Sequence, residues 1–419
     1  MSIHLLQDHN ESSVDTSRNL FSAGSATRLI AGLLLAPLAF APFAKAQATS
    51  PAQKPAAAAV PARWIGAGDT PDDAGPLATD LSPALTTAAI DKAMRKVGDW
   101  QLERGREHFT QDWTFAALYT GFIAAAESLP NPAYQEAMID VGKKYNWTLG
   151  ARLNHADDHA IGQMYLSLYL KLHDPQMMAP TKTQFDQLMT IPDDPAKPVW
   201  WWCDALFMGP PVWAKLYTAT GNKAYLGYID REWWITSKLL YDPVNHLYFR
   251  DATFLNKKEK NGQPLFWSRG NGWVLAGLAR VLQNMPENYP TRQKYVEQFQ
   301  QMAARIAPLQ GSDGLWRTGL LDQSAYALPE NSGSAFFVYA MAWGINHHLL
   351  DEKTYRPVVE KGWKGLVQKV YADGRLGWVQ PIGAAPGAFT PTSSYVYGVG
   401  AFLLAGSELK QLHPTHSKH

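Results

Sequence analysis

Residues 112–127 read DWTFAALYTGFIAAAE, and this stretch decides how we interpret the rest of the chain. It opens with Asp112, a residue type whose side chain accepts the free N–H groups at the start of a helix. The positions that follow are small or apolar on nearly every face, which is typical of a helix buried on all sides. The stretch therefore predicts a buried helix that begins directly after Asp112.

The same pattern of a polar opening followed by an apolar run occurs five more times. The runs are HAIGQMYLSLYL after Asp157 or Asp158, ALFMGPPVWAKLY after Asp204, RGNGWVLAGLARVL after Ser268, GSAFFVYAMAWGI after Ser332 and SSYVYGVGAFLLAG after Thr392. Amphipathic segments lie between them, and several open with a turn followed by a tyrosine, namely Tyr134, Tyr225, Tyr295 and Tyr355. This alternation of buried and amphipathic helices indicates six repeated helical hairpins.

Six hairpins can close into a ring, which is an all-α (α/α)6 barrel. An open solenoid is the alternative, but it would need polar capping helices at its ends, and the last run is as apolar as the others. We therefore predict a closed barrel with short β-hairpin pieces in the connecting loops, at 247–250 and 314–317. The inner helices of such a barrel run parallel, so their polar openings should gather at one end: Asp112, Asp157, Asp158, Asp204, Arg269, Ser332 and Ser393.

Asp204 lies within the aromatic and apolar sequence WWWCDALFM, residues 200–208. Burial disfavours the charged form of a carboxyl group, so its pKa should be raised. An aspartic acid that keeps its proton near neutral pH, beside aromatic rings that can stack on sugars, suits general acid catalysis on a carbohydrate. The alternative is that Asp204 caps the helix that starts at Ala205.

A second polar cluster, NHADDH, occupies residues 154–159. His155 and His159 are four residues apart and would share a helix face, an arrangement that some metal sites use. No third His or Cys ligand accompanies them, so we expect no metal. We expect one of Asp157 and Asp158 to cap the helix and the other to face a substrate.

Two further groups are candidates for binding a substrate at the same end of the barrel. Arg269, in FWSRGNGW at 266–273, has a planar guanidinium that matches a carboxylate, although it could instead pair with one of the aspartates. Ser393 and Ser394 provide hydroxyl and N–H donors at a helix start, which can bind an anion.

The composition and the N-terminal segment indicate an exported protein. The 38 basic and 37 acidic side chains leave no net field for nucleic acid or an anionic membrane. We predict a signal peptide at 1–46, an Ala/Pro-rich linker at 47–62 and a single catalytic domain at 63–419. Cys203 is the only cysteine, so no internal disulfide can form, which fits a bacterial periplasmic or secreted location.

Four blocks of the sequence, taken together, resemble the unsaturated uronyl hydrolases of glycoside hydrolase family 105, which is related to family 88. The blocks are WWCDALFM at 201–208, FWSRGNGW at 266–273, DGLWR at 313–317 and SGSA at 332–335. They occur in the family's order, and the resemblance extends over roughly residues 83–410. It implies the same (α/α)6 barrel.

Enzymes of this family remove the terminal 4,5-unsaturated uronic acid that polysaccharide lyases leave behind, by adding water across its C4=C5 double bond. The resemblance implies that Asp204 protonates C4 and then activates water for C5. A second family aspartate maps onto the pair Asp157–Asp158 without deciding between them. A histidine that many relatives have after residues 249–251 is missing here, and Arg250 is the candidate replacement.

The resemblance also implies a set of substrate contacts. Trp267 and Arg269 match pocket positions of the family, and Trp113 lies where an aromatic wall is expected. Together with the clusters described above, the expected contacts are Trp113, His155, Trp201, Trp267, Arg269, Trp273, Ser393 and Ser394.

The sequence thus predicts a hydrolase for small oligosaccharides with an unsaturated uronyl end, of the rhamnogalacturonan type or with a glucuronyl terminus. We expect no metal and no organic cofactor, because this acid–base hydration needs only carboxyl groups. Two alternatives stay open. One is an ordinary inverting glycosidase that uses Asp204 with Asp157 or Asp158, and the other is a glycan-binding barrel without activity.

Overall fold

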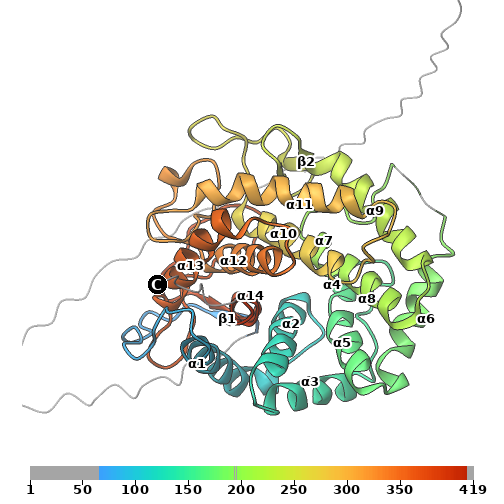
Figure 1. The fold of residues 1–419 in the computed structure, drawn as a ribbon, viewed down its shortest axis with the longest axis horizontal. Coiled ribbons are helices and arrows are strands. Elements are labelled where there is room, and N and C mark those ends of the chain that lie inside the picture. Colours follow the sequence, from blue (N-terminus) through green and yellow to red (C-terminus); the bar gives the residue numbers. More distant parts are fainter. Residues whose placement is uncertain (1–65, 193, 195, 413–419) are drawn as a thin grey trace, which may run out of the picture. The chain divides into compact units, whose positions relative to one another are not determined.

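The computed structural model describes residues 66–192, 194 and 196–412 (Figure 1). The predicted signal peptide, the whole predicted linker and residues 63–65 of the predicted catalytic domain lie outside the described residues. The helices described below all belong to one compact unit of the chain.

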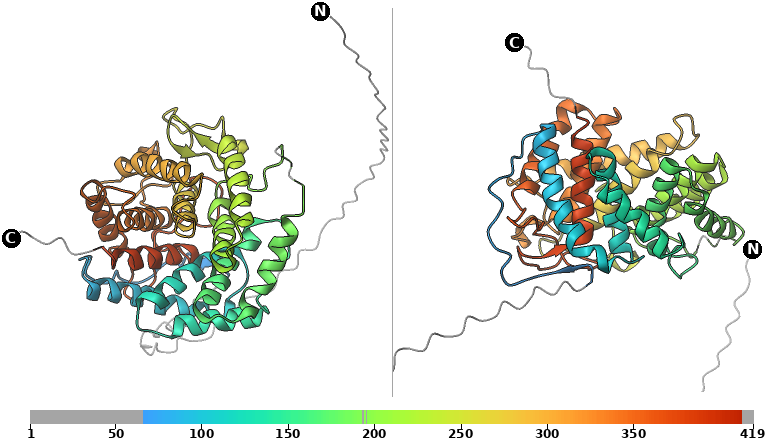
Figure 2. Two further views of the ribbon diagram at one scale, coloured as in Figure 1. Left: turned by 45° about the vertical axis from the view of Figure 1, so that its right-hand side comes forward. Right: turned by 90° about the horizontal axis from the view of Figure 1, so that it is seen from below.

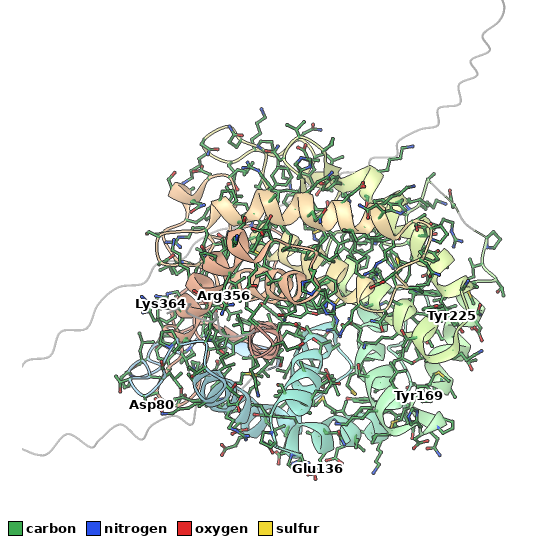
Figure 3. The ribbon with its side chains drawn as sticks, in the orientation of Figure 1. Asp80, Glu136, Tyr169, Tyr225, Arg356 and Lys364 are labelled. Carbon is green, nitrogen blue, oxygen red and sulfur yellow. The ribbon has the colours of Figure 1, made fainter. Side chains whose placement is uncertain are left out.

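Amphipathic helices form the outer layer of the barrel. Each has one apolar face, with residues such as Ile90 and Met94 of α1 buried against the inner layer. These outer helices are α1 (Thr87–Gly105), α3 (Ala133–Lys144), α6 (Ala179–Leu188), α9 (Ala224–Leu240), α11 (Arg292–Ile306) and α13 (Glu352–Val367). The side chain of Glu136 in α3 is exposed at the periphery of the ring (Figure 3).

The apolar runs form the inner layer, as predicted. In order, the inner helices are α2 (Trp113–Ser128), α4 (Ala156–His159) with α5 (Gly162–Leu172), α7 (Ala205–Met208) with α8 (Pro210–Thr220), α10 (Ser268–Leu282), α12 (Asn331–Asn346) and α14 (Val396–Leu409). In α10, α12 and α14 every residue except Asn346 is buried. The second and third inner helices are each split in two, the latter at Pro210, whose ring has no N–H to donate.

The ring of inner helices is closed. Each inner helix packs against the next in chain order, and α14 packs against α2 as well as α12. Figure 2 shows α14 beside α1 and α2, so the last hairpin meets the first. This confirms the predicted (α/α)6 barrel and excludes the open solenoid for the described residues.

The closing contact needs glycine on both helices. A β-carbon on Gly400 would overlap the carbonyl group of Ala117, and one on Gly121 would overlap the backbone of Gly400. The backbones of α2 and α14 therefore touch directly.

Several predicted helix starts are wrong, although Asp112 does cap α2 by accepting the N–H of Thr114 at 2.9 Å. His155, rather than Asp157 or Asp158, caps α4. Glu330, rather than Ser332, caps α12 by accepting the N–H groups of Ser332 and Gly333. The last inner helix starts at Val396 rather than after Thr392, because Ser394 and Tyr395 pair with an N-terminal strand.

Short strands tie the loops together. β2 (Tyr241–Asp242) and β3 (Leu247–Tyr248) form a hairpin close to the predicted one, and β1 (Gly68–Asp69) pairs antiparallel with β4 (Ser394–Tyr395). The predicted piece at 314–317 forms only an isolated bridge between Arg317 and Pro329. Among the described residues, no helix combines the length and the apolar character needed to cross a membrane.

Replacing Gly400 by alanine should destabilise the fold by about 1–3 kcal/mol, because the added methyl group must push two helix backbones apart. Gly227 in α9 is a matched control, since a β-carbon there would contact nothing, and alanine should be neutral or stabilising by up to about 1 kcal/mol. Urea unfolding measures both free energies. Equal effects at the two positions would contradict the proposed closing contact.

Candidate active site

Asp204 lies immediately before α7 and does not act as a helix cap, since its side chain accepts no N–H from that helix. Only 13% of the side chain is exposed. Its Oδ2 lies 3.5 Å from the thiol of Cys203 and 3.7 Å from the Nε of Arg250. Burial raises the pKa of Asp204, while the charges of Arg250 and Arg269 act in the opposite direction.

Local backbone contacts hold Asp204 in place. The N–H of Cys203 donates to the carbonyl of Arg250 at 2.8 Å, and Trp202 forms a β-bridge with Asp251. The hydroxyl of Thr236 in α9 donates to the carbonyl of Trp200 at 2.7 Å. The segment before Asp204 is therefore anchored on two other parts of the chain, which positions the backbone of Asp204.

The structure distinguishes Asp157 from Asp158. Asp158 accepts hydrogen bonds from the side chain and the N–H of Arg152, at 2.6 Å each. Burial raises the pKa of Asp158, but these bonds outweigh it, so the net pKa is lowered. No described residue donates a hydrogen bond to the carboxyl group of Asp157. Its pKa is raised to about 7, first by burial and second by the charge of Asp204. Asp157 is thus the candidate partner of Asp204.

His155 and His159 do not form a metal site. The Nδ1 of His155 accepts the N–H of Asp157, and its ring packs against Trp202 with the centroids 4.9 Å apart. His159 is buried, and its Nε2 bonds to the carbonyl oxygen of Leu153 at 2.8 Å. No three His, Cys, Asp or Glu side chains within the described ranges are grouped so that they could bind a metal ion.

Arg269 is engaged within the protein. It is fully buried, and it donates from Nη1 to the carbonyl of Gln380 at 2.7 Å and from Nη2 to that of Pro381 at 2.8 Å. Its guanidinium lies between the rings of Trp267 and Tyr397, 4.4 and 4.9 Å from their centroids. No ion pair joins it to an aspartate among the described residues. Arg269 therefore positions the loop around Gln380 and acts on Asp204 only through its charge.

Gln380 is the centre of a buried network that the sequence did not reveal. Its Oε1 accepts from Trp267, its N–H donates to Glu330, and the hydroxyl of Tyr397 donates to its carbonyl. Ser393 joins this region by donating to the carbonyl of Val379 at 2.7 Å. Ser393 and Ser394 are both buried.

The predicted tryptophans differ in their access to solvent. Trp201 is 47% exposed, next to Trp202, with ring centroids 4.7 Å apart. Trp113 is partly exposed and stacks on Tyr397 at 5.6 Å. Trp273 is fully buried, 6.1 Å from Trp113 at an edge. Trp201 and Trp113 can therefore contact a sugar. Trp273 cannot, and instead packs against Trp113.

Sequence reasoning missed Glu330, Gln380 and Asp251. Glu330 is buried and caps α12. Its position two residues before Ser332 was a weak indication in the sequence that it could cap this helix. Asp251 accepts from Arg250 at 2.6 Å. We find no pattern in the sequence that singles out Gln380.

A cavity of about 410 Å³ lies at the other end of the barrel, near the last turns of the inner helices. Its charged side chains include Lys215, Arg280 and Glu408. Arg280 donates to Gln163 at 2.6 Å, and Glu408 accepts from Asn346 at 2.9 Å. No predicted site residue lines this cavity, and no tryptophan does, so it is a poorer candidate for a sugar site than the region around Asp204.

Comparison with known proteins agrees with this barrel. Residues 87–413 match the model of Glycosyl Hydrolase Family 88. The chain is 39% identical over 351 residues to the unsaturated 3S-rhamnoglycuronyl hydrolase of Formosa agariphila, an alignment that covers 78% of this chain and 92% of the relative. It is 31% identical over 368 residues to the enzyme of the same name from Alteromonas sp., covering 79% and 89%.

A solved glycosyl hydrolase family 88 structure from Bacteroides vulgatus has a TM-score of 0.75 to this fold at 31% identity, covering 78% of this chain and 100% of the other. The predicted resemblance and the predicted hydrolase class are thereby confirmed. The chain belongs to Glycosyl Hydrolase Family 88.

Proposed function

We propose that this protein removes a terminal 4,5-unsaturated uronyl residue from an oligosaccharide by hydrating the C4=C5 double bond, with Asp204 as the proton donor. The observation that carries the proposal is a desolvated carboxyl group that caps no helix, lies 3.7 Å from an arginine and is still 13% exposed to solvent. The names of the two relatives support the substrate class.

The chemistry requires one proton and one water molecule. The carboxyl group of Asp204 gives its proton to C4, and the positive charge that develops at C5 is stabilised by the ring oxygen. The resulting carboxylate takes a proton from water as the water oxygen bonds to C5. The hemiketal then opens to a C5 ketone, and the hemiacetal left at C1 collapses to an aldehyde and releases the next sugar. Asp204 ends the cycle protonated, as it began.

Asp157 assists the protonation of C4 by Asp204 through its charge. Two desolvated carboxyl groups within electrostatic reach of one another resist being ionised together, so the pair keeps one proton near neutral pH. That proton is the one that catalysis needs. Burial together with the charge of its neighbour therefore suits this pair to acid catalysis without a metal.

For the leaving sugar we propose a rhamnose unit, because both relatives are named rhamnoglycuronyl hydrolases. The exposed ring of Trp201 lies beside Arg250, with the guanidinium carbon 5.7 Å from the ring centroid. An apolar sugar face can stack on it while the uronyl end reaches Asp204. Export from the cytoplasm, which the apolar run at 29–43 favours, is part of the same proposal.

Replacing Asp204 by asparagine should lower kcat by at least about 100-fold, because an amide cannot give the proton, while substrate binding and stability are largely kept. Loss of the ultraviolet absorbance of the conjugated double bond measures turnover on a panel of lyase-generated oligosaccharides. The control is Asp186→Asn, a carboxyl group in α6 that accepts from Tyr225 at 2.6 Å and should be dispensable.

An Asp204→Asn variant within a few-fold of the native rate would exclude Asp204 as the acid. Release of reducing sugar without loss of that absorbance would favour the inverting glycosidase. Binding of the sugars with neither change would favour a glycan-binding barrel.

The pH dependence tests the shared proton. Asp157 has a pKa of about 7, so kcat/KM should fall as pH rises through this value, where the pair loses its last proton. Replacing Asp157 by asparagine removes the like charge, so Asp204 should lose its proton at lower pH and the alkaline limb should shift downward. If the alkaline limb of kcat/KM lies at the same pH in Asp157→Asn as in the native enzyme, the two carboxyl groups do not titrate together.

A further inference from the structure

The guanidinium of Arg250 is hydrogen-bonded to the protein through one nitrogen and has no hydrogen-bond partner at another. Its Nη1 donates to Asp251 at 2.6 Å, and Asp251 is fixed in turn by the N–H and the hydroxyl of Thr253, at 2.8 and 2.6 Å. Its Nε faces Asp204 Oδ2 at 3.7 Å, which is too long for a hydrogen bond. This Nε is buried and has no hydrogen-bond partner. The guanidinium therefore faces the acid without being satisfied by it.

The two arginines that act on Asp204 differ in what they can still bind. Arg269 is fully buried, and both of its Nη groups donate to backbone carbonyls. The side chain of Arg250 is 22% exposed and lies beside the exposed ring of Trp201. An anion that approaches from solvent along Trp201 can reach Arg250 but cannot reach Arg269.

We propose that Arg250 is shared between Asp204 and the substrate: in the free enzyme it faces the carboxylate of Asp204, and in the complex it binds the carboxylate of the unsaturated uronyl residue. This inference rests on the function proposed above and adds a residue that selects for acidic substrates. A planar guanidinium with a free edge is well suited to a second carboxylate.

The exchange favours the protonated form of Asp204 when an acidic substrate is bound. In the free enzyme, burial raises the pKa of Asp204, and the charges of Arg250 and Arg269 oppose this rise. A substrate carboxylate bound to Arg250 cancels one of these positive charges. The pKa of Asp204 then rises further, so Asp204 holds the proton that C4 receives.

The other charged and titratable groups nearby do not exchange partners in this way. Asp158 stays bound to Arg152, and Asp251 stays bound to Thr253. His155 uses Nδ1 to accept the N–H of Asp157, and the buried thiol of Cys203 has a pKa raised by burial. Arg250 is therefore the group through which a bound anion can change the charge at Asp204.

The test compares an unsaturated uronyl oligosaccharide with its methyl ester, using the loss of double-bond absorbance. The native enzyme should turn over the acid at least 10-fold better than the ester in kcat/KM. Arg250→Met should lower kcat/KM for the acid about 10- to 100-fold and change that for the ester only a few-fold, so the preference disappears. Arg250→Lys keeps the charge and should keep part of the preference.

The free enzyme gives an independent readout. Without the charge of Arg250, Asp204 holds its proton more tightly, so the alkaline limb of kcat/KM for the ester should move to higher pH in Arg250→Met. If Arg250 had only a structural role, the variant would lower kcat/KM equally for the acid and the ester. The alkaline limb of the pH profile would then stay at the same pH. The control is Arg356→Met in the outer helix α13 (Figure 3), where Arg356 pairs with Glu352 and Glu360, and it should change neither quantity.

The outcomes separate this inference from the proposed function. An enzyme that removes the double-bond absorbance, but whose Arg250→Met variant still prefers the acid 10-fold, overturns the role of Arg250 alone. An enzyme that leaves the absorbance unchanged on every substrate overturns the proposed function itself, together with this inference.

Discussion

The proposed activity depends on two carboxyl groups that are shielded from water at one end of a closed ring of helices. Asp157 lies in α4 and Asp204 directly before α7, and these two helices pack against one another. Each carboxyl group lacks the strong hydrogen bonds that would fix it as an ordinary carboxylate, as those from Arg152 fix Asp158. Desolvation of a carboxyl group is unfavourable for folding, so the surrounding packing must be tight and complete.

Two features provide that packing. The first is the direct backbone contact of α2 with α14 at Gly121 and Gly400, which closes the ring. The second is the network around Gln380, where Glu330, Trp267 and Arg269 satisfy buried donors and acceptors of a loop that has no regular structure. A rigid wall of this kind allows an acid to be desolvated without collapse of the surrounding residues.

The repeat of apolar runs was sufficient to predict the fold. Helices that are apolar on all sides can only be buried, and six of them alternating with amphipathic helices leave few arrangements other than a ring. The burial of Asp204 could be predicted as well, because it is the only acidic residue within an aromatic and apolar run. The helix caps were predicted less well. The rule that Ser, Thr or Asp begins a helix failed at Glu330 and at Tyr395, where tertiary contacts decide the start.

Other parts of the site depend on contacts between residues far apart in the chain. Nothing in the local sequence tells Asp157 from Asp158, since the difference lies in a bond from Arg152 across a turn. The sequence suggested that Arg269 faces a ligand, but its partners are the carbonyls of residues 380 and 381, more than a hundred positions away. A pattern predicts which residue types meet, whereas the direction in which each side chain points follows only from the folded backbone.

The most direct measurement of the central claim is turnover in D₂O followed by NMR. If a carboxyl group of this site protonates carbon, the first turnovers should place one deuterium at C4 of each released residue, and at the same rate the double bond should disappear. Release of the next sugar with the C4=C5 bond intact and no deuterium at C4 would contradict the account.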